Sequence, residues 1–333
     1  MQDNFNSPVG KVRQDPSSWP TRTVVRIVVT ASLLIGIGFG LNWQSLGNVL
    51  TRPDPVWTLA AVAGVGVAHL ICCLISSICL RAGGAEITPS RIVVNHLRGL
   101  FANQLLPTAL AGDVYRLTDL CRSSSNVNVR TAASMLVVQR ACGVVVAVGL
   151  ATVFGAREIV WASSTARVTV SVLTSFVVLG VVAAILYWRG EVLQVIGWLR
   201  SRARRATEVL AAALALSLAQ QCVLIVSTWM MAQGLDLSVG LASIALVVPL
   251  SLIAVVLPVS VNGLGVREAV YAFVLSQVGV PTEAAVGLAV SMLMISVGYA
   301  ALGGATLWRS PSPPSRRMET ATESASHTLC RKV

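Results

Sequence analysis

Long apolar runs without charge limit what this chain can fold into more than any other feature of its sequence. Residues 56–80, for example, contain no Asp, Glu, Lys or Arg, and only 12% of the chain is charged, against roughly 25% in a soluble domain. A run of this length crosses the hydrocarbon core of a bilayer as a helix. Alternation with period 2 is weak, which argues against a β-barrel. The chain is therefore predicted to be an all-α polytopic membrane protein.

These runs define one integral membrane domain at residues 23–308, between tails at 1–22 and 309–333 that are predicted to be disordered and cytoplasmic. The first tail is polar and does not resemble a cleaved signal peptide, so the first span is expected to be retained. The predicted spans and shorter apolar segments are 24–42, 56–80, 99–115, 132–153, 168–188, 208–231, 239–257, 268–279 and 284–308.

The net charge of +11 does not indicate a nucleic-acid partner. Its basic residues gather next to apolar runs, in 81–98, 116–130 and 189–207, as they do in the cytoplasmic loops of membrane proteins. This bias predicts that both termini lie in the cytoplasm. Seven cysteines and three histidines show no metal-ligand spacing, so neither a metal nor a cofactor is expected.

One pattern occurs twice: Leu-Pro, four residues, Gly, three residues, Arg. The two copies are 151 residues apart (258 − 107), and this offset also superposes the predicted spans of repeat 1, about 23–155, on those of repeat 2, about 167–308. It places His69 over Gln220. The copies are Leu106-Pro107, Gly112 and Arg116, and Leu257-Pro258, Gly263 and Arg267.

Each repeat is predicted to hold three transmembrane helices and one re-entrant broken-helix hairpin. Residues 99–115 are too short to cross the bilayer, and basic residues flank both ends, so this segment is expected to enter and leave on the cytoplasmic side. An odd number of crossings per repeat gives the second repeat the opposite orientation. The result is the inverted-repeat architecture of many transporters, in which the broken helices meet at the substrate site.

The chemistry of the repeated pattern suits an anion. A broken helix frees N–H groups, Gly112 and Gly263 let a ligand approach the backbone, and the following arginine offers a planar fork for phosphate. Pro107 and Pro258 are the predicted hinges. Asp113 and Glu268 either hold the arginines while the site is empty or meet a cationic part of the substrate.

Each of these residues also has a structural interpretation. Arg116 could serve as a cytoplasmic anchor that snorkels, as could Arg267, and Asp113 and Glu268 could be salt-bridge partners only. Arg140 either snorkels or pairs with Asp113. The proline and glycine residues could be kinks without a ligand. Three amides either cap helix ends or touch the ligand, and His69 is either a packing residue or a proton relay. The amides are Asn103, Gln104 and Asn262.

The two copies resemble the signatures of a known family, the flippase-like transmembrane region of lysylphosphatidylglycerol synthases, over roughly residues 20–308. The resemblance implies an inner-membrane protein that moves or handles lipids; relatives are linked to aminoacylated phosphatidylglycerol, hopanoids and lipid-linked sugars. Ala111 stands where a second Gly is usual, and Gln139 where an acidic residue is usual, which puts an ion pair in doubt. The matching runs are Asn103–Pro107, Gly112-Asp113, Arg116, Leu257-Pro258, Gly263–Gly265 and Arg267-Glu268.

The leading hypothesis is a lipid translocase without enzymatic activity, whose partner is a membrane phospholipid or a lipid-linked substrate. About 25 residues follow the last span, so no synthase domain is expected. One alternative is a non-catalytic partner of a lipid-modifying enzyme. The other, a membrane transferase, lacks a clustered base or metal site in the sequence.

Overall fold

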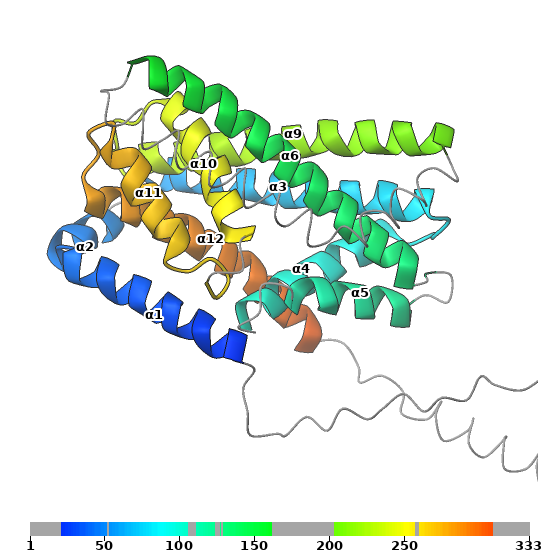
Figure 1. Ribbon diagram of the computed structural model, residues 1–333. Coiled ribbons are helices and arrows are strands. Elements are labelled where there is room, and N and C mark those ends of the chain that lie inside the picture. The colour runs from blue at the N-terminus through cyan, green and yellow to red at the C-terminus, as the bar shows by residue number, and fades with distance from the viewer. Residues whose placement is uncertain are drawn as a thin grey trace, which may run out of the picture.

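The computed structural model describes residues 21–51, 53–105, 111–123, 127, 129–161, 203–256 and 260–308, and within these ranges every regular element is an α-helix (Figure 1). The all-α prediction is confirmed. The span predicted at 168–188 lies outside the described residues, as do both predicted hinges, Pro107 and Pro258.

Four described helices are long and apolar enough to cross a membrane. Their membrane segments are Pro55–Ala82, Thr131–Gly155, Thr207–Gly234 and Thr282–Trp308, and each end lies within three residues of the predicted span. Exposed leucines and valines lie along the outside of these helices, as on a surface that faces lipid. The chain is a multi-pass membrane protein. The helices are α3 (Pro55–Ala82), α6 (Val129–Trp161), α9 (Ala203–Gly234) and α12 (Thr282–Trp308).

Local chemistry determines where α3 begins and how far it reaches. Asp54 caps its first turn, accepting the N–H of Val56 at 2.8 Å, and Pro55 occupies the first helical position, where no N–H is needed. Its 28 residues extend about 42 Å, more than a hydrocarbon core of about 30 Å.

The first predicted span is followed by a helix in the stretch between 42 and 56, where the sequence predicted no apolar segment. Helix α1 (Thr21–Gly40) ends before α2 (Trp43–Thr51), and the apolar part of α1 is bent from α2 by 98°. Asn42 explains the second start, because its side-chain oxygen accepts the N–H groups of Gln44 at 3.1 Å and Ser45 at 3.2 Å. A polar side chain at a turn carries no hydrophobic periodicity, so the apolar pattern did not indicate α2.

The helices that flank the repeated pattern keep its 151-residue offset. The first pair is α4 (Pro89–Leu105) and α5 (Ala111–Ser123), and the second is α10 (Leu241–Val256) and α11 (Val266–Ser276). Adding 151 to the bounds of α4, 89 and 105, gives 240 and 256, which are the bounds of α10 to within one residue. Adding 151 to those of α3 gives 206 and 233, inside α9.

Corresponding helices also pack in corresponding ways. Helices α3 and α9 run antiparallel, because the Asp54 N–H donates to the Gly234 carbonyl at 2.7 Å while Gly64 lies against Ser227 further along. Helix α4 packs on α12, and its counterpart α10 packs on α6, the counterpart of α12. These contacts agree with two oppositely oriented repeats, although the inversion itself stays a prediction.

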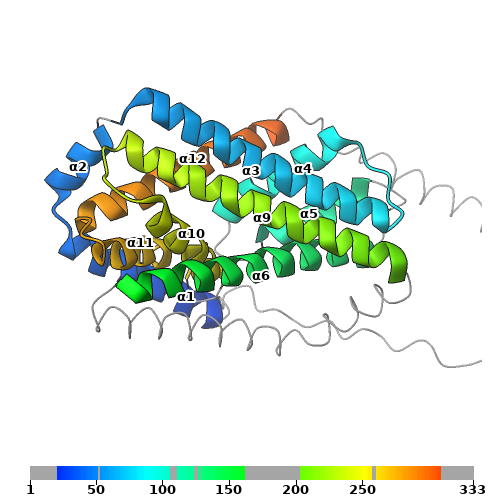
Figure 2. The same ribbon diagram turned by 90° about the horizontal axis from the view of Figure 1, so that it is seen from above.

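The long helices carry two hydrophobic cores toward their two ends. One core joins α9, α10, α11 and α12 around Ile244, Ile253 and Leu288, and the other joins α3, α4, α5 and α6 around Ile75 and Met135. Figures 1 and 2 show the pair α4–α5 and the pair α10–α11 toward opposite ends of the long helices. The described end of α4 and the turn before α11 meet between the two pairs, where Asn262 contacts Gln104.

Candidate functional site

Helices α4 and α5 form an antiparallel hairpin around the first copy of the pattern. The Asn95 amide donates to the Asp119 carboxylate at 2.9 Å, near the open end of the hairpin. Toward its tip, Asn103 Oδ1 accepts the Gly112 N–H at 2.7 Å. The 17 residues of α4 reach about 26 Å, which falls short of a bilayer core.

The tips of the two hairpins touch. Asn262, in the turn before α11, donates from its side-chain nitrogen to Gln104 Oε1, at the end of α4, over 2.9 Å. The turn is tight: Asn262 has a φ of 50°, and Gly263 and Gly265 have φ values of 75° and 81°. The Val261 N–H donates to Thr30 Oγ1 on α1 at 2.8 Å and anchors the same turn. The structure thus brings together two of the three predicted site amides.

Arg116 points into the protein. It is 8% exposed, and its terminal nitrogen donates to Ser76 Oγ and to Gln139 Oε1, each at 3.1 Å. A guanidinium with these partners does not snorkel to the interface. Its Nε is buried and finds no acceptor among the described residues, so part of its donor fork is unused.

Asp113 is paired with Arg140. Arg140 Nε lies 2.6 Å from Asp113 Oδ2, and a second guanidinium nitrogen contacts the same oxygen. Of the two alternatives for Arg140, the structure shows the pair. Asp113 therefore balances the arginine of α6 and not Arg116, which has only neutral hydrogen-bond partners among the described residues.

In the second copy, Glu268 balances Arg267. Glu268 is 4% exposed, and one of its oxygens lies 3.5 Å from a guanidinium nitrogen of Arg267. The other oxygen accepts the Gly265 N–H at 2.7 Å and so caps α11. Arg267 Nε is buried and, like that of Arg116, has no acceptor in the described part of the chain.

Comparison with known proteins finds a family that matches most of the chain. The family model described as the lysylphosphatidylglycerol synthase TM region matches residues 23–303, which include both copies of the pattern. The chain belongs to this family. A search of curated proteins finds no match. As a member of the lysylphosphatidylglycerol synthase TM region family, the chain has a membrane role related to lipids.

Two departures from the family's usual residues can now be placed. Gln139, which the sequence comparison placed where an acidic residue is usual, accepts a hydrogen bond from Arg116 through its neutral amide. Ala111 is buried at the start of α5. The adjacent Gly112 lies so close to the Gly99 carbonyl and to Asn103 that a Cβ would collide with both.

A polar cluster beside Arg116 was not predicted as part of the site. Its nearest members are Ser76 and Cys72 on α3, with Gln139 donating to the Cys72 carbonyl at 3.1 Å. Behind Cys72 lies His96, whose Nε2 is 3.1 Å from His69 Nδ1. The comparison of the two repeats could not indicate this cluster, because repeat 2 has no matching polar residues. The positions 151 residues after Cys72, His96 and Gln139 are all valine.

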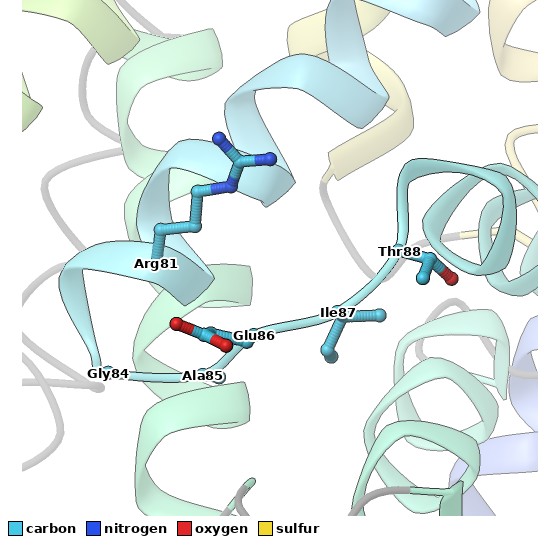
Figure 3. Close-up of a pocket in the computed structure, with 6 residues that line it drawn as sticks. All are labelled: Arg81, Gly84, Ala85, Glu86, Ile87 and Thr88. Carbon is cyan, nitrogen blue, oxygen red and sulfur yellow. The ribbon is translucent and has the colours of Figure 1, made fainter.

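A cavity in the described part of the chain lies away from these residues. It has a volume of about 650 Å³ and follows the connection from α3 to α4, with Arg81, Glu86 and Thr88 among its lining residues. Figure 3 shows that connection running beneath the Arg81 side chain. None of the predicted site residues lines it, so the candidate site consists of the two hairpin tips and the buried arginines behind them.

Proposed function

We propose that the protein is a lipid translocase that binds a phosphate-bearing headgroup between the two hairpins and passes it from one leaflet to the other. The observation that carries the proposal is the pair of arginines of the repeated pattern, each buried with an unused Nε–H, behind hairpin tips that touch each other. A buried, unsatisfied guanidinium N–H is costly, and a phosphate oxygen is the acceptor that suits it.

The N-termini of α5 and α11 support the same site. An early N–H of α5 is taken by the Asn103 side chain, and that of Gly265, which precedes α11, is taken by the Glu268 carboxylate. Helix N-termini of this kind attract anions. In the empty protein the two side chains satisfy the donors, and a headgroup phosphate can exchange with them at little cost in hydrogen bonds.

The packing supports movement of one repeat against the other. Each hairpin rests on a long helix of the other repeat, α4 on α12 and α10 on α6, so rotation of one repeat moves both hairpins relative to each other. The Gln104–Asn262 hydrogen bond closes the path between them in this state. In this proposal both termini lie in the cytoplasm of a bacterial inner membrane.

The test uses the full chain in proteoliposomes that contain fluorescent phosphatidylglycerol, whose accessibility to an external quencher reports its movement between leaflets. Arg116→Ala and Arg267→Ala should each reduce the rate at least about ten-fold, the cost of one lost charge-assisted hydrogen bond. Arg91→Ala is the matched control, because Arg91 is an exposed arginine at the start of α4.

Lysine variants separate the effect of losing the guanidinium fork from the effects of losing the charge or the fold. Arg116→Lys and Arg267→Lys keep the charge but lose the fork, so they should fold and remain slow. Wild-type rates for both alanine variants would remove the arginines from the site. Movement no faster than in protein-free vesicles, for every phospholipid tested with the wild-type protein, would overturn the translocase proposal itself.

A further inference from the structure

We propose that His69 and His96 form a proton-binding site that is coupled to occupancy of the headgroup site by an anion. The inference rests on the proposed function and adds a second ligand, a proton, to it. Neither histidine belongs to either copy of the repeated pattern.

The geometry is that of a shared proton. His96 Nε2 and His69 Nδ1 are 3.1 Å apart, a distance at which one ring donates its N–H to the other. His96 is 5% exposed, and its remaining nitrogen, Nδ1, lies 3.7 Å from Cys72 Sγ. The remaining nitrogen of His69, Nε2, is buried and finds no partner among the described residues. One position on the pair can therefore still accept a proton.

The pair is joined to Arg116 by an unbroken series of contacts. His96 contacts Cys72, Gln139 donates to Cys72 Sγ at 2.6 Å, and the oxygen of the same Gln139 amide accepts from Arg116. The Gln139 amide can accept from Arg116 and donate to Cys72 in only one of its two orientations. Movement of the Arg116 guanidinium therefore shifts the Gln139 amide and, through Cys72, the surroundings of His96.

Charge supplies the coupling. The titratable or charged groups that face the pair are Cys72 on α3, Arg116 on α5 and Tyr299 on α12, whose ring lies 5.0 Å from that of His69. Among these, Arg116 alone carries a full charge, and it repels a proton added to the pair. A phosphate bound to Arg116 offsets that repulsion, so anion and proton favour each other's binding.

The two histidines lie where a hairpin of one repeat packs against a long helix of the other repeat. His69 lies on α3 against His96 of α4 and Tyr299 of α12, and the Tyr299 hydroxyl donates to the Val62 carbonyl of α3 at 2.9 Å. His96 lies on α4, which packs on the same α12. A proton gained between α3 and α4 therefore changes the charge at a joint between a hairpin of one repeat and a long helix of the other.

The first experiment needs no lipid. The chain contains three histidines, so ¹⁵N-histidine labelling of the detergent-solubilised protein resolves each one by NMR during a pH titration between about pH 3 and pH 8. Arg116→Gln should raise the pH at which the pair takes up its proton by about one unit, while Arg91→Gln leaves it unchanged. Equal titration in wild type and Arg116→Gln would overturn the coupling.

The second experiment measures coupling to the ligand. Calorimetry with dihexanoylphosphatidylglycerol in two buffers of different ionisation enthalpy gives the number of protons taken up on binding. Wild type and His327→Gln, which removes the third histidine, should take up a fraction of one proton, and affinity should rise as the pH falls, by at most about ten-fold per unit. His69→Gln and His96→Gln should take up none, and their affinity should not change with pH.

The two proposals fail in different ways. Lipid binding without proton uptake, or uptake that persists in both histidine variants, overturns the proton site and leaves the translocase proposal standing. Absence of lipid binding and movement overturns the translocase proposal, and the titration of Arg116→Gln then decides the charge coupling alone.

Discussion

Gln104 and Asn262 are 158 residues apart in the chain, and a 2.9 Å hydrogen bond joins their side-chain amides. The bond connects the tips of the two hairpins, one from each copy of the repeated pattern. Its donor sits in a turn with a positive φ, a conformation that asparagine tolerates better than most residues. The contact makes the relative position of the hairpins measurable.

Cross-linking these two positions should stop lipid movement. After the reactive native cysteines are replaced by serine, Gln104→Cys with Asn262→Cys should react with a short bifunctional methanethiosulfonate reagent, and the rate in proteoliposomes should fall to the protein-free background. A reducing agent should restore it. Each single cysteine variant treated in the same way is the control. Continued movement in the cross-linked protein would mean that the tips do not separate during transport.

Loss of the Asp113–Arg140 pair should cost little stability. The Arg140 side chain is 43% exposed, so the pair contributes about 1 kcal/mol or less. Asp113→Asn and Arg140→Gln should each lower the apparent Tm by a few degrees, and the double variant should lose less than the two single losses added together. Thermal unfolding followed by size-exclusion chromatography measures the apparent Tm of the wild type, the two single variants and the double variant. Strictly additive losses would show that the two side chains do not interact.

Gly112 should not tolerate a side chain. An added Cβ would lie 2.6 Å from Asn103 Cγ and would also meet the Gly99 carbonyl, so Gly112→Ala should destabilise the protein by about 1–3 kcal/mol. Gly143→Ala in α6 is the control, since no atom lies within 4 Å of its Cβ position. The control should be neutral or stabilising by up to about 1 kcal/mol. Equal thermal stability of the two variants would contradict the close packing of α4 and α5.

Glu268 should show two separable roles. Glu268→Ala removes the cap of α11 and should cost about 1–2 kcal/mol, whereas Glu268→Gln keeps an acceptor for the Gly265 N–H and should cost less. Neutralising the carboxylate beside Arg267 also removes the anion that competes with a phosphate. Calorimetry with dihexanoylphosphatidylglycerol should therefore find tighter binding to Glu268→Gln, by a few-fold. Weaker binding would instead make the carboxylate part of the substrate site.

Much of the fold follows from hydrophobicity alone. The spans around His69 and Arg140 were predicted to within three residues because apolar runs of this length, with at most one charge, cross a bilayer as helices. The turn at Asn42 was not predicted, since a single capping side chain gives no periodic signal. Of the site, the pattern indicated Arg116, Arg267 and their glycines, and left open whether Asp113 holds Arg116 or pairs with Arg140; the structure shows the pair with Arg140.

The sequence by itself determined that this chain is a helical membrane protein with one Gly–Arg pattern used twice, because charge-free length and residue spacing are properties of the chain itself. Only the tertiary structure decided that Arg116 binds Ser76 and Gln139, that Arg140 takes Asp113, and that the histidines meet. Those partners come from different helices, and the angle and depth at which helices cross depend on side-chain packing between them, which no local spacing records.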